Sequence, residues 1–230
     1  FKGFSYFTEM SDIINRLEDH VASARMKTTP VIDFEKNESL KGLDYLDTIY
    51  HAIVNEHPIQ LKYRSFKARS ANSFIFYPYL LKEYRNRWFV YGVRGNGRIL
   101  QNLALDRIQS LEVLPQEHYI KNTFFDPNTF FDDLVGVTKN SGSVAEKIGF
   151  KVAAAEAPYI ITKPIHRSQQ VVERLADGSV ILEIEVVINH ELERVFFGYA
   201  EGIQILYPKT LVELMGRKLK KAAEQYTHSK

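Results

Sequence analysis

The chain has 230 residues and a formal net charge of +2; 45% of its residues are hydrophobic and 25% are charged. This composition is that of an ordinary globular protein, which excludes disordered and collagen-like classes, and the length allows one large domain or two small ones. A charge this small does not indicate polyanion binding by itself, and the lack of cysteine excludes disulfides and thiolate metal sites.

Two amphipathic helices are predicted before the first strand. Apolar residues from Met10 to Ala24 recur at helical spacing, and Thr8 or Ser11 can cap that helix. A second helix is predicted over residues 40–56, where His57-Pro58 ends it. Residues 1–58 therefore form a predicted helical region.

The hydrophobic period changes to two after Pro58, which indicates strands. Along the first of them Tyr63 and Ser65 share one face. Asn96-Gly97 suits a tight hairpin turn, because both residues tolerate positive φ angles. The predicted strands cover residues 59–65, 74–81, 87–93, 100–108 and 110–113. Five short strands after a helix predict a small barrel of the SH3 or Sm type.

The second half of the chain predicts an α/β domain. Asp126-Pro127 has the features of a helix start and Gly136 those of its end. The later elements are predicted at 148–153, 158–163, 170–188, 191–199, 204–206 and from Pro208 onward. Their β-α-β-β-α-β-α order resembles a ferredoxin-like sandwich. We therefore predict an α+β fold with three parts, over residues 1–58, 59–137 and 143–230.

The sequence patterns that could indicate a catalytic or metal-binding site are incomplete. His190-Glu191 resembles the start of a helical zinc motif, but Arg194 stands where the second histidine is needed. Asp132 and Asp133 are adjacent on a predicted helix, so they point apart and are expected to be solvated. No nucleophile, base and orienting group can be assembled. We expect neither enzymatic activity nor a metal or cofactor.

Two basic regions leave alternatives open. Arg217, Lys218, Lys220 and Lys221 on the last helix form either an exposed face or a phosphate contact. In the strands, tyrosines and arginines alternate along the chain, as in small barrels that bind single strands or nucleotides. The same rings are also suited to fill the core.

Several ordered motifs resemble the WYL domain of bacterial transcriptional regulators and its C-terminal extension. They are Leu61-x-Tyr63-x-Ser65, Tyr77-Pro78-Tyr79, Trp88-Phe89-Val90, Asp106-Arg107-Ile108 and Ile205-Leu206-Tyr207-Pro208. Trp88-Phe89-Val90 stands where the family has Trp-Tyr-Leu, so two of the three naming residues are replaced. The resemblance extends over nearly the whole chain.

The resemblance implies an effector-sensing region whose winged helix-turn-helix is absent from a chain that begins at Phe1. The implied effector is a nucleic acid or nucleotide-like ligand. Gln101 occupies a position where the family usually has arginine, with Arg98 three residues earlier. The ligand-binding residues that we predict are Tyr63, Ser65, Tyr91, Arg98, Gln101 and Arg107.

Convergence of this site depends on strand order. Gln101 and Arg107 share one face of the predicted strand over 100–108, and this face can meet Tyr63 and Ser65 if the strands are neighbours. The alternative makes Tyr63 a core residue and Asp106-Arg107 a structural ion pair.

The resemblance also sets expectations about partners and location. We expect a cytoplasmic homodimer that meets duplex DNA only through the absent part and does not contact membranes. A second interpretation is an Sm-like adaptor that binds single-stranded nucleic acid and has no DNA-binding domain of its own.

Overall fold

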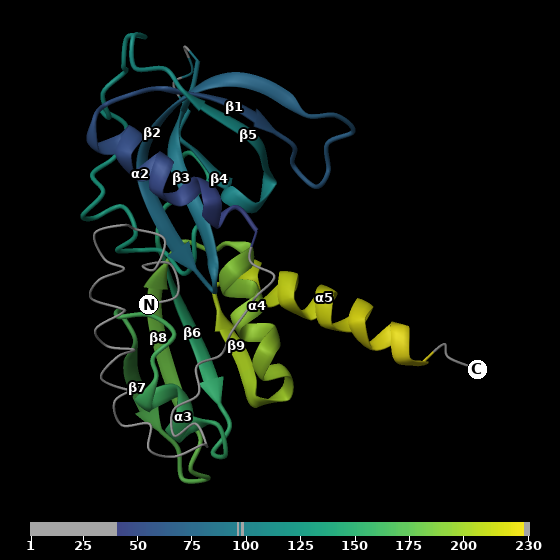
Figure 1. Ribbon diagram of the computed structural model, residues 1–230. Helices are drawn as coiled ribbons and strands as arrows, with labels where there is room; N and C mark the ends of the chain where they lie inside the picture. The colour runs from purple at the N-terminus through teal and green to yellow at the C-terminus, as the bar shows by residue number, and fades with distance from the viewer. Residues whose placement is uncertain (1–40, 96, 98, 228–230) are drawn as a thin grey trace, which may run out of the picture. The chain divides into compact units, whose positions relative to one another are not determined.

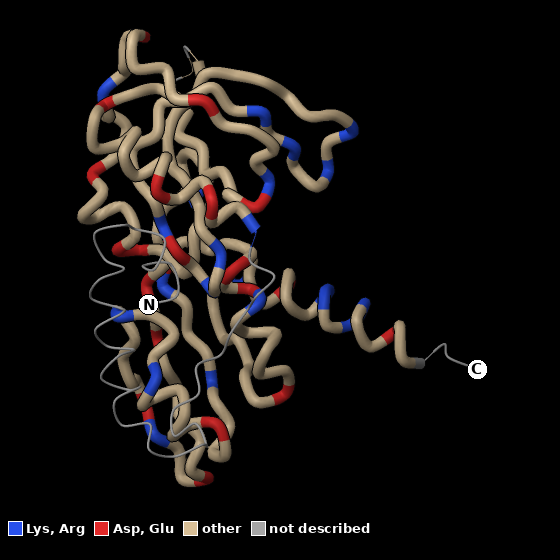
Figure 2. The backbone as a smooth tube through the Cα atoms, in the orientation of Figure 1, with Lys and Arg blue, Asp and Glu red and all other residues tan. Residues whose placement is uncertain are grey.

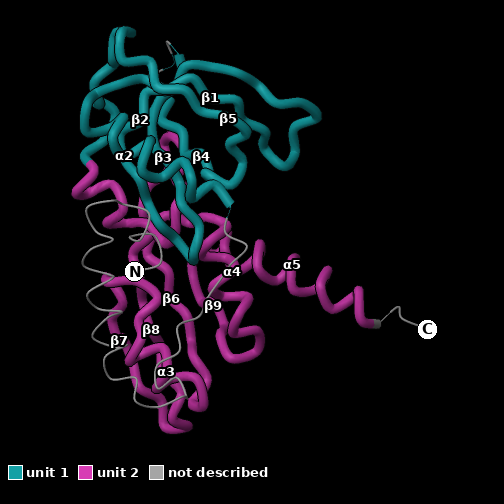
Figure 3. Tube along the Cα trace, viewed as in Figure 1, with its two compact units in different colours: residues 1–126 teal, residues 127–230 magenta. Residues whose placement is uncertain are grey.

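The computed structural model describes residues 41–95, 97 and 99–227 (Figure 1). The predicted helix from Met10 to Ala24, together with Asn96 and Arg98, lies outside these residues. The chain divides into two compact units, residues 1–126 and 127–230 (Figure 3). Each unit contains one antiparallel sheet with a few helices, so the predicted α+β class is confirmed. The three-part division proposed from the sequence stays a prediction.

The first unit is a helix followed by a five-stranded sheet. Its elements are η2 (Leu43–Tyr45), α2 (Leu46–Val54), β1 (Ile59–Tyr63), β2 (Asn72–Tyr84), β3 (Arg87–Arg94), β4 (Gln101–Ala104), η3 (Leu105–Arg107) and β5 (Ile108–Val113). The strand order is β4-β3-β2-β1-β5. The two edge strands, β4 and β5, do not pair within the described residues. Closure of the predicted barrel is therefore not observed, and the sheet is open.

The predicted strand over 100–108 is wrong in its second half. It ends at Ala104, and the 3-10 turn η3 separates it from β5. The reason lies in the strand order, because β4 pairs with β3 whereas β5 pairs with β1. The chain must cross from one edge of the sheet to the other between Ala104 and Ile108. Leu105, which is buried, anchors this crossing in the core.

Both faces of the first sheet are covered. On one face α2 packs against residues that include Leu61, Phe76, Val90 and Leu105. The other face carries Tyr77, Tyr79 and Val93, and the segment 114–125 covers it with Tyr119, Ile120, Phe124 and Phe125. Many of the aromatic residues that could have formed a ligand surface therefore belong to the core.

The second unit contains a four-stranded sheet in the order β7-β8-β6-β9. Its elements are β6 (Glu146–Val152), α3 (Ala157–Thr162), β7 (Gln170–Arg174), β8 (Val180–Val186), α4 (His190–Tyr199), η4 (Ala200–Gly202), β9 (Ile203–Tyr207) and α5 (Lys209–Thr227). Along β8 every second residue from Val180 to Val186 is buried, so one face of the sheet supports the core. The element order is the one expected from the sequence. No helix in the described ranges is long and apolar enough to cross a membrane.

The helix predicted from Asp126 to Gly136 is not formed. Residues 127–133 make turns instead, in which Asp132 N–H donates to the carbonyl three residues earlier at 3.0 Å. The end of the segment is bound to other elements: the carbonyl of Asp133 accepts from Val187 N–H at 2.8 Å, and that of Val135 accepts from the Asn189 amide. The segment is thereby fixed to the end of β8 and the start of α4.

Candidate ligand-binding site

Tyr63 and Arg107 lie close together, as predicted from the sequence, but the strands that bring them together are not the predicted ones. Tyr63 ends β1 and pairs with Ile108 of β5 after a register shift. Arg64 N–H donates to the Arg107 carbonyl at 3.1 Å, which fixes η3 beside the end of β1. The neighbour of β1 is thus β5 and not β4, so the condition for the predicted convergence was wrong although the two residues meet.

The phenol of Tyr63 is partly buried in this corner. Burial is the largest effect on its pKa and raises it, while the charge of Arg107 and hydrogen bonds with the Ala104 backbone and the Arg107 side chain act in the opposite direction. The net result is a raised pKa, so the hydroxyl keeps its proton at neutral pH. Tyr63 therefore presents a neutral hydrogen-bonding group next to a permanent positive charge.

Asp106 precedes Arg107 in η3 and contacts two arginines. Its Oδ2 lies 3.2 Å from Nε of Arg87 on β3. Its Oδ1 lies 3.9 Å from Nε of Arg107, and these two atoms are buried with no hydrogen-bond partner. The closer ion pair of Asp106 is therefore with Arg87, which the sequence did not predict.

Phe66 lies in the connection between β1 and β2, residues 64–71. The ring is 73% exposed, and the guanidinium carbon of Arg107 lies 4.4 Å from its centroid. This is the geometry of a cation–π contact. Phe66 was not among the predicted ligand-binding residues, because its exposure depends on the shape of the connection.

Basic residues without acidic neighbours surround this corner. From His57 to Lys82 the sequence contains no Asp or Glu. Within that stretch, Arg64, Lys67 and Arg69 are exposed on the connection between β1 and β2. Figure 2 shows this connection extending from the sheet with Lys and Arg along it. The local potential is therefore positive although the whole chain is nearly neutral.

The remaining predicted residues do not all join Tyr63 and Arg107. Ser65 is half-buried just beyond β1, where its carbonyl accepts from Ala68 N–H at 3.0 Å. Gln101 begins β4 opposite Gly92, and the face that it was expected to share with Arg107 does not exist because the strand ends at Ala104. Tyr91 is 3% exposed and packs against Phe125, on the face that segment 114–125 covers.

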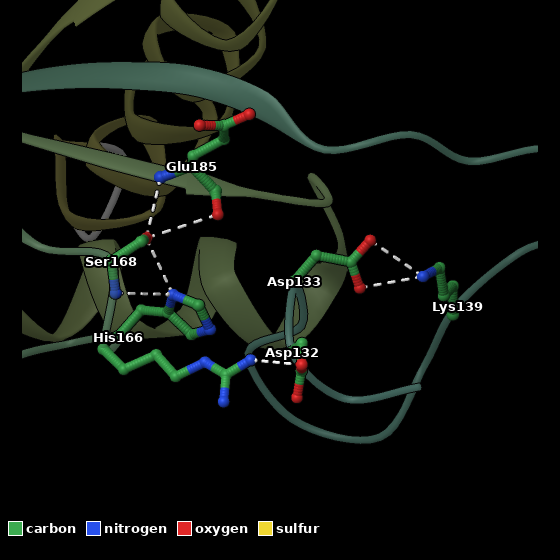
Figure 4. A network of polar contacts seen from close by, with 7 residues as sticks. Asp132, Asp133, Lys139, His166, Ser168 and Glu185 are labelled. Carbon is green, nitrogen blue, oxygen red and sulfur yellow. Dashed lines mark hydrogen bonds and ion pairs between the residues drawn. The ribbon is translucent and has the colours of Figure 1, made fainter. Parts of the chain in front are cut away.

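A second polar network lies in the other unit (Figure 4). His166 Nδ1 is 2.8 Å from Ser168 Oγ, which accepts from Glu185 N–H at 2.9 Å. Asp132 pairs with Arg167 at 2.6 Å and Asp133 pairs with Lys139 at 2.8 Å, so the expectation that both carboxylates are simply solvated is wrong. Because the Ser168 hydroxyl is bonded to the backbone of β8, we interpret this network as a structural clasp between segment 127–139 and the loop before β7.

Metal binding receives no support from the described residues. They contain no group of three or more His, Asp or Glu side chains that could hold a metal ion. The basic run on α5 is exposed, and Lys218 within it pairs with Glu193. Tyr63 and Arg107, with Phe66 and the basic connection, therefore form the candidate site.

Comparisons with known proteins agree with the resemblance drawn from the motifs. The model of the WYL domain matches residues 44–113, and the model of the WCX domain matches residues 145–223. No curated protein matches the chain significantly.

Similar solved structures include proteasome accessory factor B/C (PafBC) of Arthrobacter aurescens, with 16% identity, a TM-score of 0.33, and coverage of 84% of this chain and 28% of that one. Another is a CRISPR Cas-related protein, with 12% identity, a TM-score of 0.47, and coverage of 81% and 52%. The chain thus spans about half or less of their length. From the two domain matches, the chain belongs to the WYL-domain family and carries a WYL domain followed by a WCX domain.

Proposed function

We propose that this chain is the effector-sensing and dimerisation region of a cytoplasmic, DNA-binding transcriptional regulator, and that its WYL domain binds a nucleic-acid or nucleotide-like effector. The observation that carries the proposal is the meeting of Tyr63 and Arg107 beside a basic connection that lacks acidic residues. A guanidinium group favours phosphate, because its planar N–H donors form charge-assisted hydrogen bonds with anionic oxygens.

The proposed role of each residue follows from the chemistry of its side chain. Arg107 meets an anionic group of the effector, the Tyr63 hydroxyl hydrogen-bonds to it, and Ser65 contributes a polar edge. Gln101, at the start of β4, and Arg98 stay predicted contributors to effector binding. Exposed basic groups on the connection, among them Lys67 and Arg69, attract a negatively charged effector over longer distances.

Contact with duplex DNA belongs, in this proposal, to a separate helix-turn-helix domain of the regulator. A regulator that binds a two-fold operator mirrors that symmetry, so the chain forms a homodimer. Light scattering tests this point: we expect twice the mass of the 26.6 kDa chain, and a monomer at tens of micromolar contradicts it.

The alternative is an Sm-like adaptor that binds single-stranded nucleic acid and has no DNA-binding domain of its own. The basic connection between β1 and β2 also supports this function. A full-length gene that encodes a helix-turn-helix upstream of Phe1 favours the regulator.

Equilibrium binding of AMP, pyrophosphate and a short single-stranded oligonucleotide tests the effector site. Arg107→Gln should weaken binding of the anionic probes by about tenfold or more, since a hydrogen bond to a charged group contributes about 1.5–3 kcal/mol. Arg85→Gln is the matched control, because Arg85 is an exposed arginine of the same unit, in the turn after β2 and over the ring of Tyr84. If Arg107→Gln and Arg85→Gln bind every probe as the unmodified chain does, the effector site lies elsewhere.

A further inference from the structure

We propose that Asp106 and Arg107 together recognise a neutral group of the effector that both donates and accepts a hydrogen bond, either a sugar hydroxyl or the edge of a base. This inference rests on the proposed function and deepens it. It gives Asp106 a role in ligand binding, and it requires the effector to carry a neutral hydrogen-bonding group in addition to its anionic group.

The first observation is an unpaired donor beside an unpaired acceptor. Four buried side-chain atoms have no hydrogen-bond partner in the described part of the chain, and two of them are Nε of Arg107 and Oδ1 of Asp106. Buried polar groups normally have partners, and an unpaired one destabilises the free protein. A ligand that satisfies both atoms removes that cost.

The distance between the two atoms defines what can satisfy them. At 3.9 Å they are too far apart to bond to each other. One hydroxyl oxygen can nevertheless lie within ordinary hydrogen-bond distance of both, accepting from the Arg107 N–H and donating to the Asp106 carboxylate. A base edge with an adjacent acceptor and donor does the same with two atoms.

The charge of Asp106 argues against a phosphate in this position. A phosphodiester has no proton to donate at neutral pH, and any phosphate oxygen is repelled by the carboxylate. Arg87 pairs with Oδ2 only, at 3.2 Å. The anionic group of the effector is therefore better placed at the outer guanidinium nitrogens of Arg107, toward the basic connection where Lys67 and Arg69 are exposed, while Nε binds the neutral group.

Phe66 covers one of the two groups. Its ring lies over the guanidinium of Arg107, and the residue is 73% exposed, so it is free to move without disturbing the core. The backbone of Arg107 is held in place, because its carbonyl accepts from Arg64 N–H at 3.1 Å. Displacement of the Phe66 ring is therefore the step that we propose exposes the Arg107 side chain to a ligand.

Asp106→Asn tests the inference, because it removes the charge and keeps the shape. We measure binding of adenosine, which is neutral, and of pyrophosphate, an anion that the carboxylate of Asp106 repels. The expected changes have opposite signs: adenosine binds at least fivefold more weakly, and pyrophosphate binds threefold or more tightly. Glu112→Gln is the matched control, since it removes the same charge from an exposed position on β5, and we expect it to leave adenosine binding unchanged.

The outcomes separate this inference from the proposed function. If Asp106→Asn moves both probes in the same direction, or moves neither, the role of Asp106 is overturned. If adenosine does not bind but pyrophosphate binds in an Arg107-dependent way, the inference fails while the effector site stands. If no probe binds the unmodified chain, both fail.

A ligand series on the unmodified chain does not depend on the folding of a variant. At least fivefold weaker binding of 2′,3′-dideoxyadenosine than of adenosine identifies the recognised group as a sugar hydroxyl. Equal binding of these two, with weaker binding of purine riboside, which lacks the amino donor, identifies the base edge. Equal binding of all three nucleosides and of 5′-deoxyadenosine, which lacks the remaining sugar hydroxyl, overturns the inference.

Discussion

The guanidinium of Arg107 lies over the ring of Phe66, 4.4 Å from its centroid. The two residues come from different parts of the first sheet, Phe66 from the connection after β1 and Arg107 from the turn η3 before β5. The contact covers a charged side chain at the proposed effector site with an aromatic ring that remains mostly exposed. It is therefore a feature that a ligand can displace.

The first prediction concerns the energy of this contact. Phe66→Leu should lower the free energy of unfolding by about 0.5–1 kcal/mol, the usual value of a cation–π contact at an exposed site. Chemical denaturation of Phe66→Leu, Arg107→Gln and the double variant measures the coupling between the two residues. A coupling energy near zero would show that the ring and the guanidinium group do not stabilise each other.

The second prediction concerns the packing of η3 against Gly42. Gly42 has φ +84°, and a Cβ there would lie 2.4 Å from the carbonyl of Leu105. Gly42→Ala should therefore destabilise the chain by more than about 2 kcal/mol. The positive φ angle is unfavourable for alanine, and the added methyl group would clash with the Leu105 carbonyl.

Gly216→Ala is the control for this substitution. Gly216 lies within α5 with open space around its Cα. Alanine at this position should stabilise the chain by up to about 1 kcal/mol through helix propensity. Equal losses of stability in the two variants would contradict the packing argument.

How far the sequence predicts this molecule depends on whether a feature is local. The period-two strands around Tyr63 and Tyr91 could be predicted, since alternation is a property of neighbouring residues. The turn at η3 could not, because the edge of the sheet that β5 joins is set by pairing with β1. The turns at 127–133 were not predicted either, and the contacts that fix this segment are with residues far away in the sequence, such as the bond of the Asp133 carbonyl with Val187.

The same distinction applies to the candidate site: residues within a sequence motif could be predicted, but their contacts with distant residues could not. The family motif selected Tyr63 and Arg107, which the structure brings together, whereas the contacts with Phe66 and Arg87 depend on how a loop and a turn meet. Tyr91 packs on the face opposite to the core that Tyr63 joins. Alternation along β3 accounts for this, because Arg94 pairs with Phe76, which belongs to the core that Tyr63 joins, and Tyr91 lies three residues from Arg94.

The third prediction compares Tyr79, which is buried, with Tyr119, which is half-buried in the segment 114–125 that covers it. The hydroxyl of Tyr79 is buried without a partner, whereas that of Tyr119 donates to the Pro78 carbonyl. Tyr79→Phe should therefore leave the free energy of unfolding unchanged or raise it, and Tyr119→Phe should lower it by about 1 kcal/mol. Urea titrations of both variants test this, and a larger loss in Tyr79→Phe than in Tyr119→Phe would refute it.

The fourth prediction concerns alkaline pH. Burial raises the pKa of Tyr79 to about 12, from an ordinary value of 10.0. The folded state therefore holds the phenol proton more tightly than the unfolded state, so this contribution to stability is complete below pH 10 and falls as the pH approaches 12. Stability measured across this range should decline less steeply in Tyr79→Phe. Parallel curves for the variant and the unmodified chain would contradict the assignment.

The last prediction concerns acid and the clasp of the second unit. Burial is the main cause that lowers the pKa of His166 below its ordinary 6.5, and the charge of Arg167 adds to it, while Asp132 and Asp133 oppose it. The unfolded state therefore binds a proton more readily, and stability falls as the pH decreases below 6.5. The neutral ring is also the form whose Nδ1 can accept from Ser168 N–H, at 3.2 Å.

His166→Gln removes the titrating group, so its melting temperature should decline less between pH 7 and pH 5 than that of the unmodified chain. His118→Gln is the control, because His118 is exposed in the first unit and should leave the decline unchanged. An equally steep decline in His166→Gln would show that other groups cause the sensitivity to acid and that protonation of His166 does not open the clasp.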